Sequence, residues 1–146
     1  MKPIEKDDRV TMGELDVEEC LVLLRWELVG RLAVAVPGEA PTVVPVSFAL
    51  DAGTVVFRTD EGEKRSRLLQ QPVSMQVDRF DWYRRVGWSV LVQGQAHEID
   101  PAELDGLDIQ PWAPGDKAHA IRIVPTSITG RRLELLPTER DRLGYL

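Results

Sequence analysis

The chain has 146 residues, and 18 Lys and Arg against 24 Asp and Glu give it a formal net charge of −6. This acidity argues against duplex nucleic acid as a partner, because neutralisation of phosphates by Lys and Arg dominates that binding. The length supports one hydrophobic core, so we expect a single domain over residues 1–146. No apolar run approaches the roughly 18 residues of a membrane span, and the lone Cys20 excludes an internal disulfide framework. We therefore expect a cytoplasmic protein without a membrane contact.

The first element along the chain is a predicted helix over residues 16–25. Residues 1–14 before it are polar and irregular, and we interpret them as a flexible N-terminal arm. Asp16 and Glu19 have the spacing of a capping box, and apolar residues then recur on one helical face. Cys20 falls on that apolar face, which indicates a small buried hydrophobe rather than a nucleophile.

Three strands are predicted next from the alternation of side chains. The first covers residues 31–36 and ends at a Pro-Gly breaker. The second covers residues 42–50 and has one bulky face and one mostly small face. Residues 51–53, Asp-Ala-Gly, form a turn into the third strand over residues 54–59. These last two strands should therefore pair as an antiparallel hairpin.

A second helix and further strands complete a mainly β chain. Residues 60–71 are predicted to be helical, because Asp60 and Glu63 again have capping-box spacing. Gly94 indicates a bulge or bend inside a later strand. Those later elements are strands over 73–80, 87–98 and 118–124, the last extended by 128–133, a helical turn at 101–107 and a loop at 111–115. Counting gives about six strands at the spacings of hairpins.

Motifs that would carry chemistry are few. The sequence has no glycine-rich phosphate loop, no nucleophile elbow and no paired histidines for a catalytic metal, which disfavours a self-contained acid–base enzyme. Basic residues do gather where a strand meets a helix, at Arg58, Lys64, Arg65 and Arg67. Such a junction suits a phosphate, because a helix N-terminus offers unpaired N–H groups. A solvated helix face, with Glu61 and Glu63 as counter-ions, explains the same spacing.

An ordered set of segments carries a resemblance over residues 16–133. The segments are VVPVSFALDAGTVVFRTDEGEK, QPVSMQVDRFD, GWSVLVQGQAHEID, PWAPG and RIVPTSITGRRL. Together they resemble the pyridoxamine 5'-phosphate oxidase-like family of FMN-binding split barrels, particularly its small bacterial members. The resemblance implies a six-stranded antiparallel split β-barrel with short helices. It also implies a homodimer with two FMN sites at the dimer interface.

The resemblance assigns one strand to the flavin ring. Its residues are Val44, Pro45, Val46, Ser47 and Phe48, whose backbone and side chains would lie along the flavin. The small residues on one face of this strand are suited to that role, because a flat ring needs close approach. A sheet-surface role for Ser47 remains the alternative.

Further cofactor-binding residues follow from the same resemblance. Arg58 and Thr59 correspond to the family's contacts at the end of the hairpin. Lys64 corresponds to the lysine that pairs with the ribityl phosphate. Trp88 and Ser89 correspond to positions that reach the flavin across the dimer interface. Arg131 lies in the region that closes the site in relatives. Structural roles are the alternatives, such as a strand end for Thr59, a core or interface aromatic for Trp88 and a solvated charge for Arg131. No metal site is expected, and the catalytic residues stay unknown.

The function implied is that of an FMN-binding oxidoreductase. Electrons would pass between the flavin and a small-molecule substrate or reduced nicotinamide, and because the flavin carries the redox chemistry the chain needs no acid–base constellation. The alternative is a non-catalytic dimer that binds a flavin, a deazaflavin coenzyme or haem on the same scaffold. A third class, a cofactor-free interaction dimer, is favoured only if the carboxylate of Glu63 repels the FMN phosphate.

Overall fold

The computed structural model describes residues 10–60, 62–109 and 118–135 of the chain. Within this part, the strands are β1 (Val10–Leu15), β2 (Val29–Val34), β3 (Thr42–Asp51), β4 (Thr54–Thr59), β5 (Pro72–Asp81), β6 (Val86–Ile99) and β7 (His119–Leu135). The helices are α1 (Val17–Arg25), α2 (Glu63–Leu68) and the 3-10 helix η1 (Pro101–Leu104).

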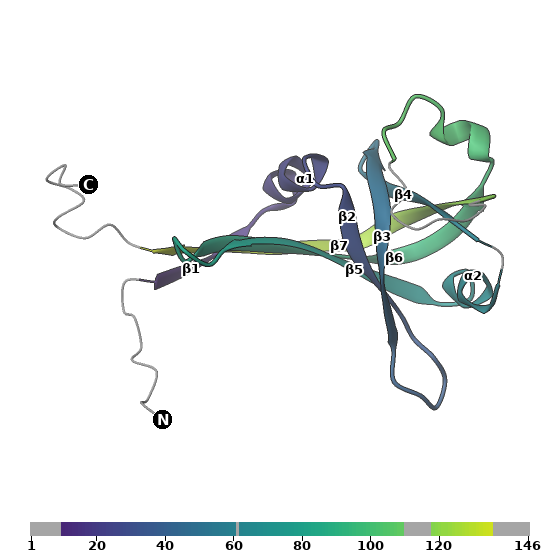
Figure 1. The fold of residues 1–146 in the computed structure, drawn as a ribbon, viewed down its shortest axis with the longest axis horizontal. Helices are drawn as coiled ribbons and strands as arrows, with labels where there is room; N and C mark the ends of the chain where they lie inside the picture. Colours follow the sequence, from purple (N-terminus) through teal and green to yellow (C-terminus); the bar gives the residue numbers. More distant parts are fainter. Residues whose placement is uncertain (1–9, 61, 110–117, 136–146) are drawn as a thin grey trace, which may run out of the picture.

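Six of these strands close a barrel (Figure 1). Antiparallel pairing runs in the order β7, β4, β3, β2, β5 and β6, and β6 pairs again with β7. The strand β1 lies outside this ring and pairs with the far end of β7. The expected mainly β, six-stranded antiparallel barrel with short helices is therefore confirmed.

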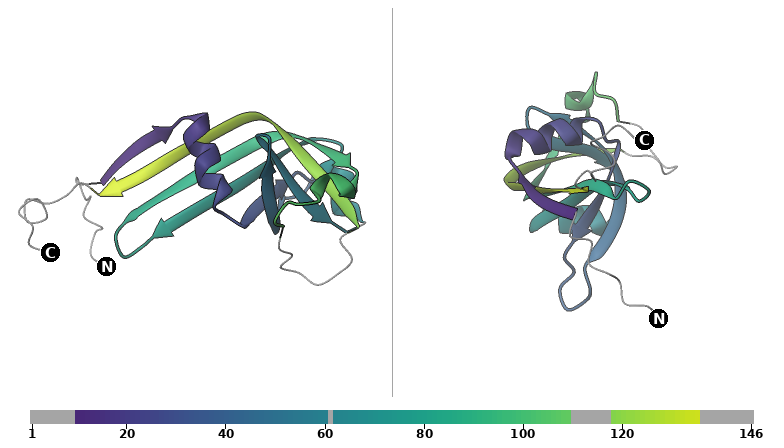
Figure 2. Two further views of the ribbon diagram at one scale, coloured as in Figure 1. Left: turned by 90° about the horizontal axis from the view of Figure 1, so that it is seen from above. Right: turned by 90° about the vertical axis from the view of Figure 1, so that its left-hand side faces the viewer.

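The length of β7 splits the sheet into two regions. One edge of β7 pairs with β4 over residues 119–123 and with β1 over residues 130–135. Beyond the barrel, β1 and the distal parts of β7, β6 and β5 continue as a flat projection, seen edge-on in Figure 1 and from above in Figure 2. We call this projection the sheet extension; its residues are 10–15, 76–91 and 129–135.

Helix α1 covers the face of the sheet that is continuous with the barrel interior. Asp16 caps it as expected, because its carboxylate accepts a hydrogen bond from the backbone N–H of Glu19 at 2.8 Å. Cys20 is fully buried in the core, and a Cβ on Gly130 would lie 2.6 Å from its Sγ, so the glycine permits the close approach. Burial first, and then the carboxylates of Asp16 and Glu19, raise the pKa of the Cys20 thiol. The prediction of a buried, hydrophobe-like cysteine is confirmed.

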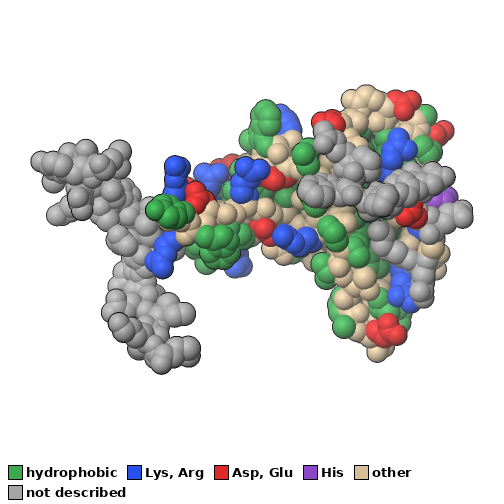
Figure 3. Space-filling view, viewed as in Figure 1, with side chains coloured by type: hydrophobic (Ala, Val, Ile, Leu, Met, Phe, Trp, Pro, Cys, Tyr) green, Lys and Arg blue, Asp and Glu red, His purple; other side chains and the backbone are tan. Residues whose placement is uncertain are grey.

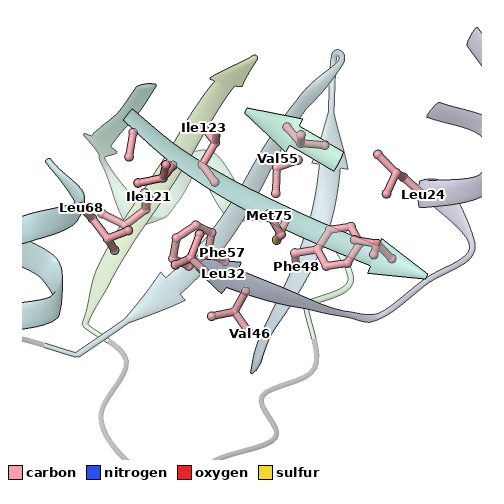
Figure 4. Packing of buried hydrophobic residues seen from close by; sticks show 14 of the residues in the cluster. Leu24, Leu32, Val46, Phe48, Val55, Phe57, Leu68, Met75, Ile121 and Ile123 are labelled. Atoms are coloured by element: carbon pink, nitrogen blue, oxygen red, sulfur yellow. The ribbon is translucent and has the colours of Figure 1, made fainter. Parts of the chain in front are cut away.

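The barrel interior is a single apolar cluster. Figure 4 shows Leu32, Phe48, Phe57 and Met75 pointing toward one another from four different strands, and each is at most 1% exposed. Leu68 on α2 is also fully buried and belongs to the same cluster. Helix α2 therefore covers the core at one end of the barrel.

The β3–β4 hairpin and the bulge confirm two sequence predictions. Ala52 and Gly53 in the turn have φ values of 49° and 77°, as a tight hairpin turn requires. The register of β6 against β7 shifts between Gln93 and Gly94. A Cβ at Gly94 would overlap the carbonyl oxygen of Val124, so the bulge needs glycine.

Two predictions at the ends of elements were wrong. Residues 10–14 belong to strand β1 rather than to a flexible arm, because β7 supplies a pairing edge from the other end of the chain. Helix α2 is shorter than the predicted 60–71, and its N-cap is Gly62, which has no side chain to cap the helix. Asp60 is therefore not the N-cap that the predicted capping box requires. The loop expected at 111–115 lies outside the described residues.

Candidate functional site

Strand alternation decides which of the candidate residues on β3 can reach a ligand. The side chains of Val46 and Phe48 are 7% and 1% exposed and point into the barrel, so only their backbone can face outward. Val44 is half-buried and packs against the same core. Pro45 and Ser47 alternate with these residues and therefore lie on the outside of the barrel. We call this side of the sheet the outer face.

Ser47 has an unusual environment. Its hydroxyl is inaccessible to solvent and has no hydrogen-bond partner among the residues that the structure describes. A buried polar group left in this state costs about 1–3 kcal/mol. A ligand that gained access to this hydroxyl and offered it a hydrogen bond would remove that cost, and the polar edge of a flavin carries such groups.

Strand β4 places Arg58 beside Ser47. Phe48 and Phe57 pair across the two strands and both point inward, so Arg58 follows on the outer face, half-buried. Thr59 points the other way and is 2% exposed, with its hydroxyl donating to the carbonyl oxygen of Asp60 at 3.4 Å. The structure thus brings Arg58 and Ser47 to one face and buries the Thr59 side chain at the barrel end.

Lys64 lies in the first turn of α2, directly after β4. Its side chain is outside those that the structure describes. The helix itself is tied to the barrel by Arg65, whose guanidinium donates to both carboxylate oxygens of Glu98 on β6. His119 Nδ1 lies 2.6 Å from Oε1 of the same carboxylate. Hydrogen bonds from Arg65 first, and then from His119, lower the pKa of Glu98 below its ordinary value.

A second group of candidate residues lies on the sheet extension. Ser89 on β6 and Arg131 on β7 are directly opposite each other in the ladder, so their side chains share a face. This face is continuous with the outside of the barrel. Arg31 on β2 is opposite Gln76 on β5, which is in turn opposite Leu91 on β6. A hollow of about 630 Å³ lies here, lined by Glu14, Gln76, Ser89, Leu91, Thr129 and Arg131.

Trp88 is on the opposite side of the sheet from Ser89. The two residues are adjacent in a strand, so their side chains point to opposite faces. Trp88 is paired with Arg79 on one side and Arg132 on the other, and these three residues line a separate hollow of about 490 Å³ on the face that α1 covers. The structure therefore brings Ser89 and Arg131 together and separates Trp88 from them.

The two groups of outer-face residues lie well apart within one chain. Ser47 and Ser89 are three strand steps from each other, through β2 and β5. At about 4.8 Å a step this is roughly 14 Å. Among the described residues, no group of three or more His, Cys, Asp or Glu side chains could hold a metal ion. In the same part of the chain no helix has both the length and the apolar character needed to cross a membrane.

A six-stranded antiparallel barrel with a projecting sheet extension and α1 across its inner face defines the split-barrel class. The family model for pyridoxamine 5'-phosphate oxidase matches residues 16–132. The chain therefore belongs to the pyridoxamine 5'-phosphate oxidase-like FMN-binding split-barrel family.

Several solved structures share this fold. An FAD binding protein from Mycobacterium smegmatis is 34% identical, with a TM-score of 0.70 and coverage of 82% of this chain and 96% of that one. A provisionally assigned pyridoxamine 5'-phosphate oxidase from Corynebacterium glutamicum is 31% identical, with a TM-score of 0.70 and coverage of 91% and 99%. An FAD-binding protein from Mesorhizobium loti is 25% identical, with a TM-score of 0.68 and coverage of 86% and 98%. These likenesses support a flavin-binding scaffold.

Proposed function

We propose that this protein is a homodimeric oxidoreductase that binds a flavin nucleotide, FMN or FAD, in the cytoplasm. One observation carries the proposal: the outer face holds two separate groups of candidate residues, one around Ser47 and one around Ser89. Two copies related by a two-fold axis can complete each other's sites, because each supplies both groups. Two solved relatives are FAD-binding proteins, which supports a flavin as the ligand. The lone cysteine supports a reducing compartment.

Each group of residues has a distinct task in this proposal. The outward side of β3 receives the flavin ring, and the Ser47 hydroxyl gains a partner on its polar edge. Arg58 on the same face, with Lys64 after it, neutralises the phosphate. Ser89 and Arg131 of the second copy close over the bound flavin from the other side, Ser89 toward the ring and Arg131 toward the phosphate end. The bound flavin supplies the redox chemistry, while these residues hold it, orient it and exclude water.

Titration of the purified protein with FMN, FAD and riboflavin tests the binding proposal. We expect quenching of flavin fluorescence with saturable binding, and weaker binding of riboflavin because it lacks the phosphate. Absence of binding by all three flavins would refute the proposal. Titration with a deazaflavin coenzyme and with haem then tests the alternative ligands.

Dimerisation and catalysis have their own measurements. Sedimentation should give a species of twice the chain mass of 16.4 kDa, and a monomer at micromolar concentration would contradict the shared site. Bleaching of the bound flavin by NADH or NADPH supports an oxidoreductase. A flavin that binds but is not reduced favours the non-catalytic storage function instead.

A further inference from the structure

We propose that Phe80 and Trp82 form a platform that stacks the adenine of a flavin dinucleotide and so favours FAD over FMN. The platform lies at the tip of the β5–β6 hairpin, on the outer face of the sheet extension. The inference rests on the proposed function, because the flavin must be held by the second copy beneath this face. It goes further by naming the longer of the two flavins and the residues that select it.

The platform is built by a glycine. Phe80 on β5 is directly opposite Gly87 on β6, and a Cβ at Gly87 would overlap the Phe80 ring. The aromatic ring therefore occupies the space that a side chain at position 87 would fill. The Trp82 ring lies next to it, with ring centroids 5.7 Å apart and planes inclined by 32°. Two aromatic side chains are thus held together at the tip.

The exposure of these rings points to a binding surface. Trp82 is 84% exposed and Phe80 is 43% exposed, although aromatic side chains usually bury most of their area. Exposed apolar patches of this kind mark sites where a ligand or partner binds. In Figure 3 hydrophobic side chains lie among Lys, Arg, Asp and Glu side chains along the sheet extension. The exposed aromatic rings suit a ligand with a flat ring.

The position of the platform favours a nucleotide in particular. Gly87 is two residues from Ser89 on the same strand face, a separation of about 7 Å. Arg131 is opposite Ser89 and is exposed, so a guanidinium and two aromatic rings share one face. A guanidinium pairs well with a pyrophosphate, and aromatic rings stack on any nucleobase. FMN ends at its single phosphate, whereas FAD continues with a second phosphate, a ribose and an adenine.

Glu14 on β1 is directly opposite Arg131, whereas the two carboxylates of β5 near the platform are already engaged. Asp78 accepts from Arg31 at 3.1 Å and from Gln76 at 3.3 Å. Asp81 accepts from the backbone N–H groups of Tyr83 and Arg84 at 3.1 Å and 3.0 Å. These hydrogen bonds offset the negative charge of Asp78 and Asp81. The two carboxylates therefore repel a pyrophosphate less than carboxylates without hydrogen bonds would.

The experiment compares FAD and FMN binding to Trp82→Ala and to Trp26→Ala. Trp26 is a matched control, because it is 77% exposed but follows α1, which covers the opposite face of the sheet. We expect Trp82→Ala to weaken FAD binding about tenfold, as loss of one base stack does, and to leave FMN binding within about twofold. Trp26→Ala should change neither. Trp82→Phe should restore most of the FAD affinity, because it keeps an aromatic face.

The outcomes separate this inference from the proposed function. Equal weakening of FAD and FMN by Trp82→Ala would show that the tip acts on the flavin or the dimer and would overturn the adenine assignment. Unchanged binding of both would overturn the platform while the flavin site stands. If wild-type protein binds neither flavin, the proposed function fails and the inference fails with it. Adenosine monophosphate should compete with FAD and not with FMN, which provides a readout independent of any variant.

Discussion

Truncation of Leu68 tests how far helix α2 depends on the barrel core. The side chain is fully buried, whereas the other described side chains of α2 are partly or wholly exposed. Replacing a buried leucine with alanine costs about 2–5 kcal/mol, through lost transfer free energy and the cavity left behind. The site is at the end of the barrel, where α2 can settle inward, so we expect about 3 kcal/mol for Leu68→Ala. For a chain of this size that lowers Tm by roughly 6–12 °C.

Denaturant unfolding and calorimetry of the variant measure this cost. The control is Leu28→Ala, because Leu28 is 46% exposed and should lose less than about 1 kcal/mol. The same sample reports on the site, because a loosened α2 displaces Lys64 and should weaken FMN binding more than riboflavin binding. A loss below 1 kcal/mol for Leu68→Ala would show that α2 does not cover the core and would refute the reasoning.

Three further changes probe the helix and its tether. Lys64→Ala should weaken FMN binding by roughly 1.5–3 kcal/mol and leave riboflavin binding nearly unchanged, and equal losses in a fluorescence titration would mean that the lysine acts through the fold. Glu63→Ser should tighten FMN binding and leave the free energy of unfolding nearly constant, since the N-cap of α2 is Gly62 and not Asp60; constant affinity with lower stability would contradict this. Glu98→Gln should destabilise the protein at neutral pH, because it removes a carboxyl whose pKa is lowered in the folded state. Such a carboxyl contributes stability above its ordinary pKa of 4.5, and this stability is lost as pH falls through the lowered pKa. Unfolding curves of wild type and Glu98→Gln should therefore converge in acid, and a gap that widened there would reverse the assignment.

Local signals accounted for most of the fold. The β3–β4 hairpin was predictable because alternation and an Asp-Ala-Gly turn lie within 18 consecutive residues, 42–59, and both φ values in that turn agree. The strand β1 was not predictable, since Val10–Leu15 shows little alternation and its partner is at the far end of the chain. A strand like this is defined by pairing, which single-sequence patterns do not contain.

The candidate site was predictable by position and less so by face. The resemblance named Trp88 and Ser89 together, although strand alternation alone implies that their side chains diverge. The group of Arg65, Glu98 and His119 had no sequence signal, because closure of the barrel is what brings α2, β6 and β7 together. The Phe80–Trp82 pair was also missed, because its meaning depends on the glycine across the ladder.

The shared edge of β7 also governs when the chain can finish folding. The hydroxyl of Thr11 donates to the carbonyl oxygen of Glu134, a contact that spans 123 residues of sequence. Until β7 has been synthesised, β4 and β6 both lack a barrel neighbour and β1 has no partner. Folding dominated by such distant pairings is slow, because loop closure must precede the contacts that reward it. The nascent chain therefore presents open strand edges until β7 emerges, and during that interval it is most exposed to aggregation.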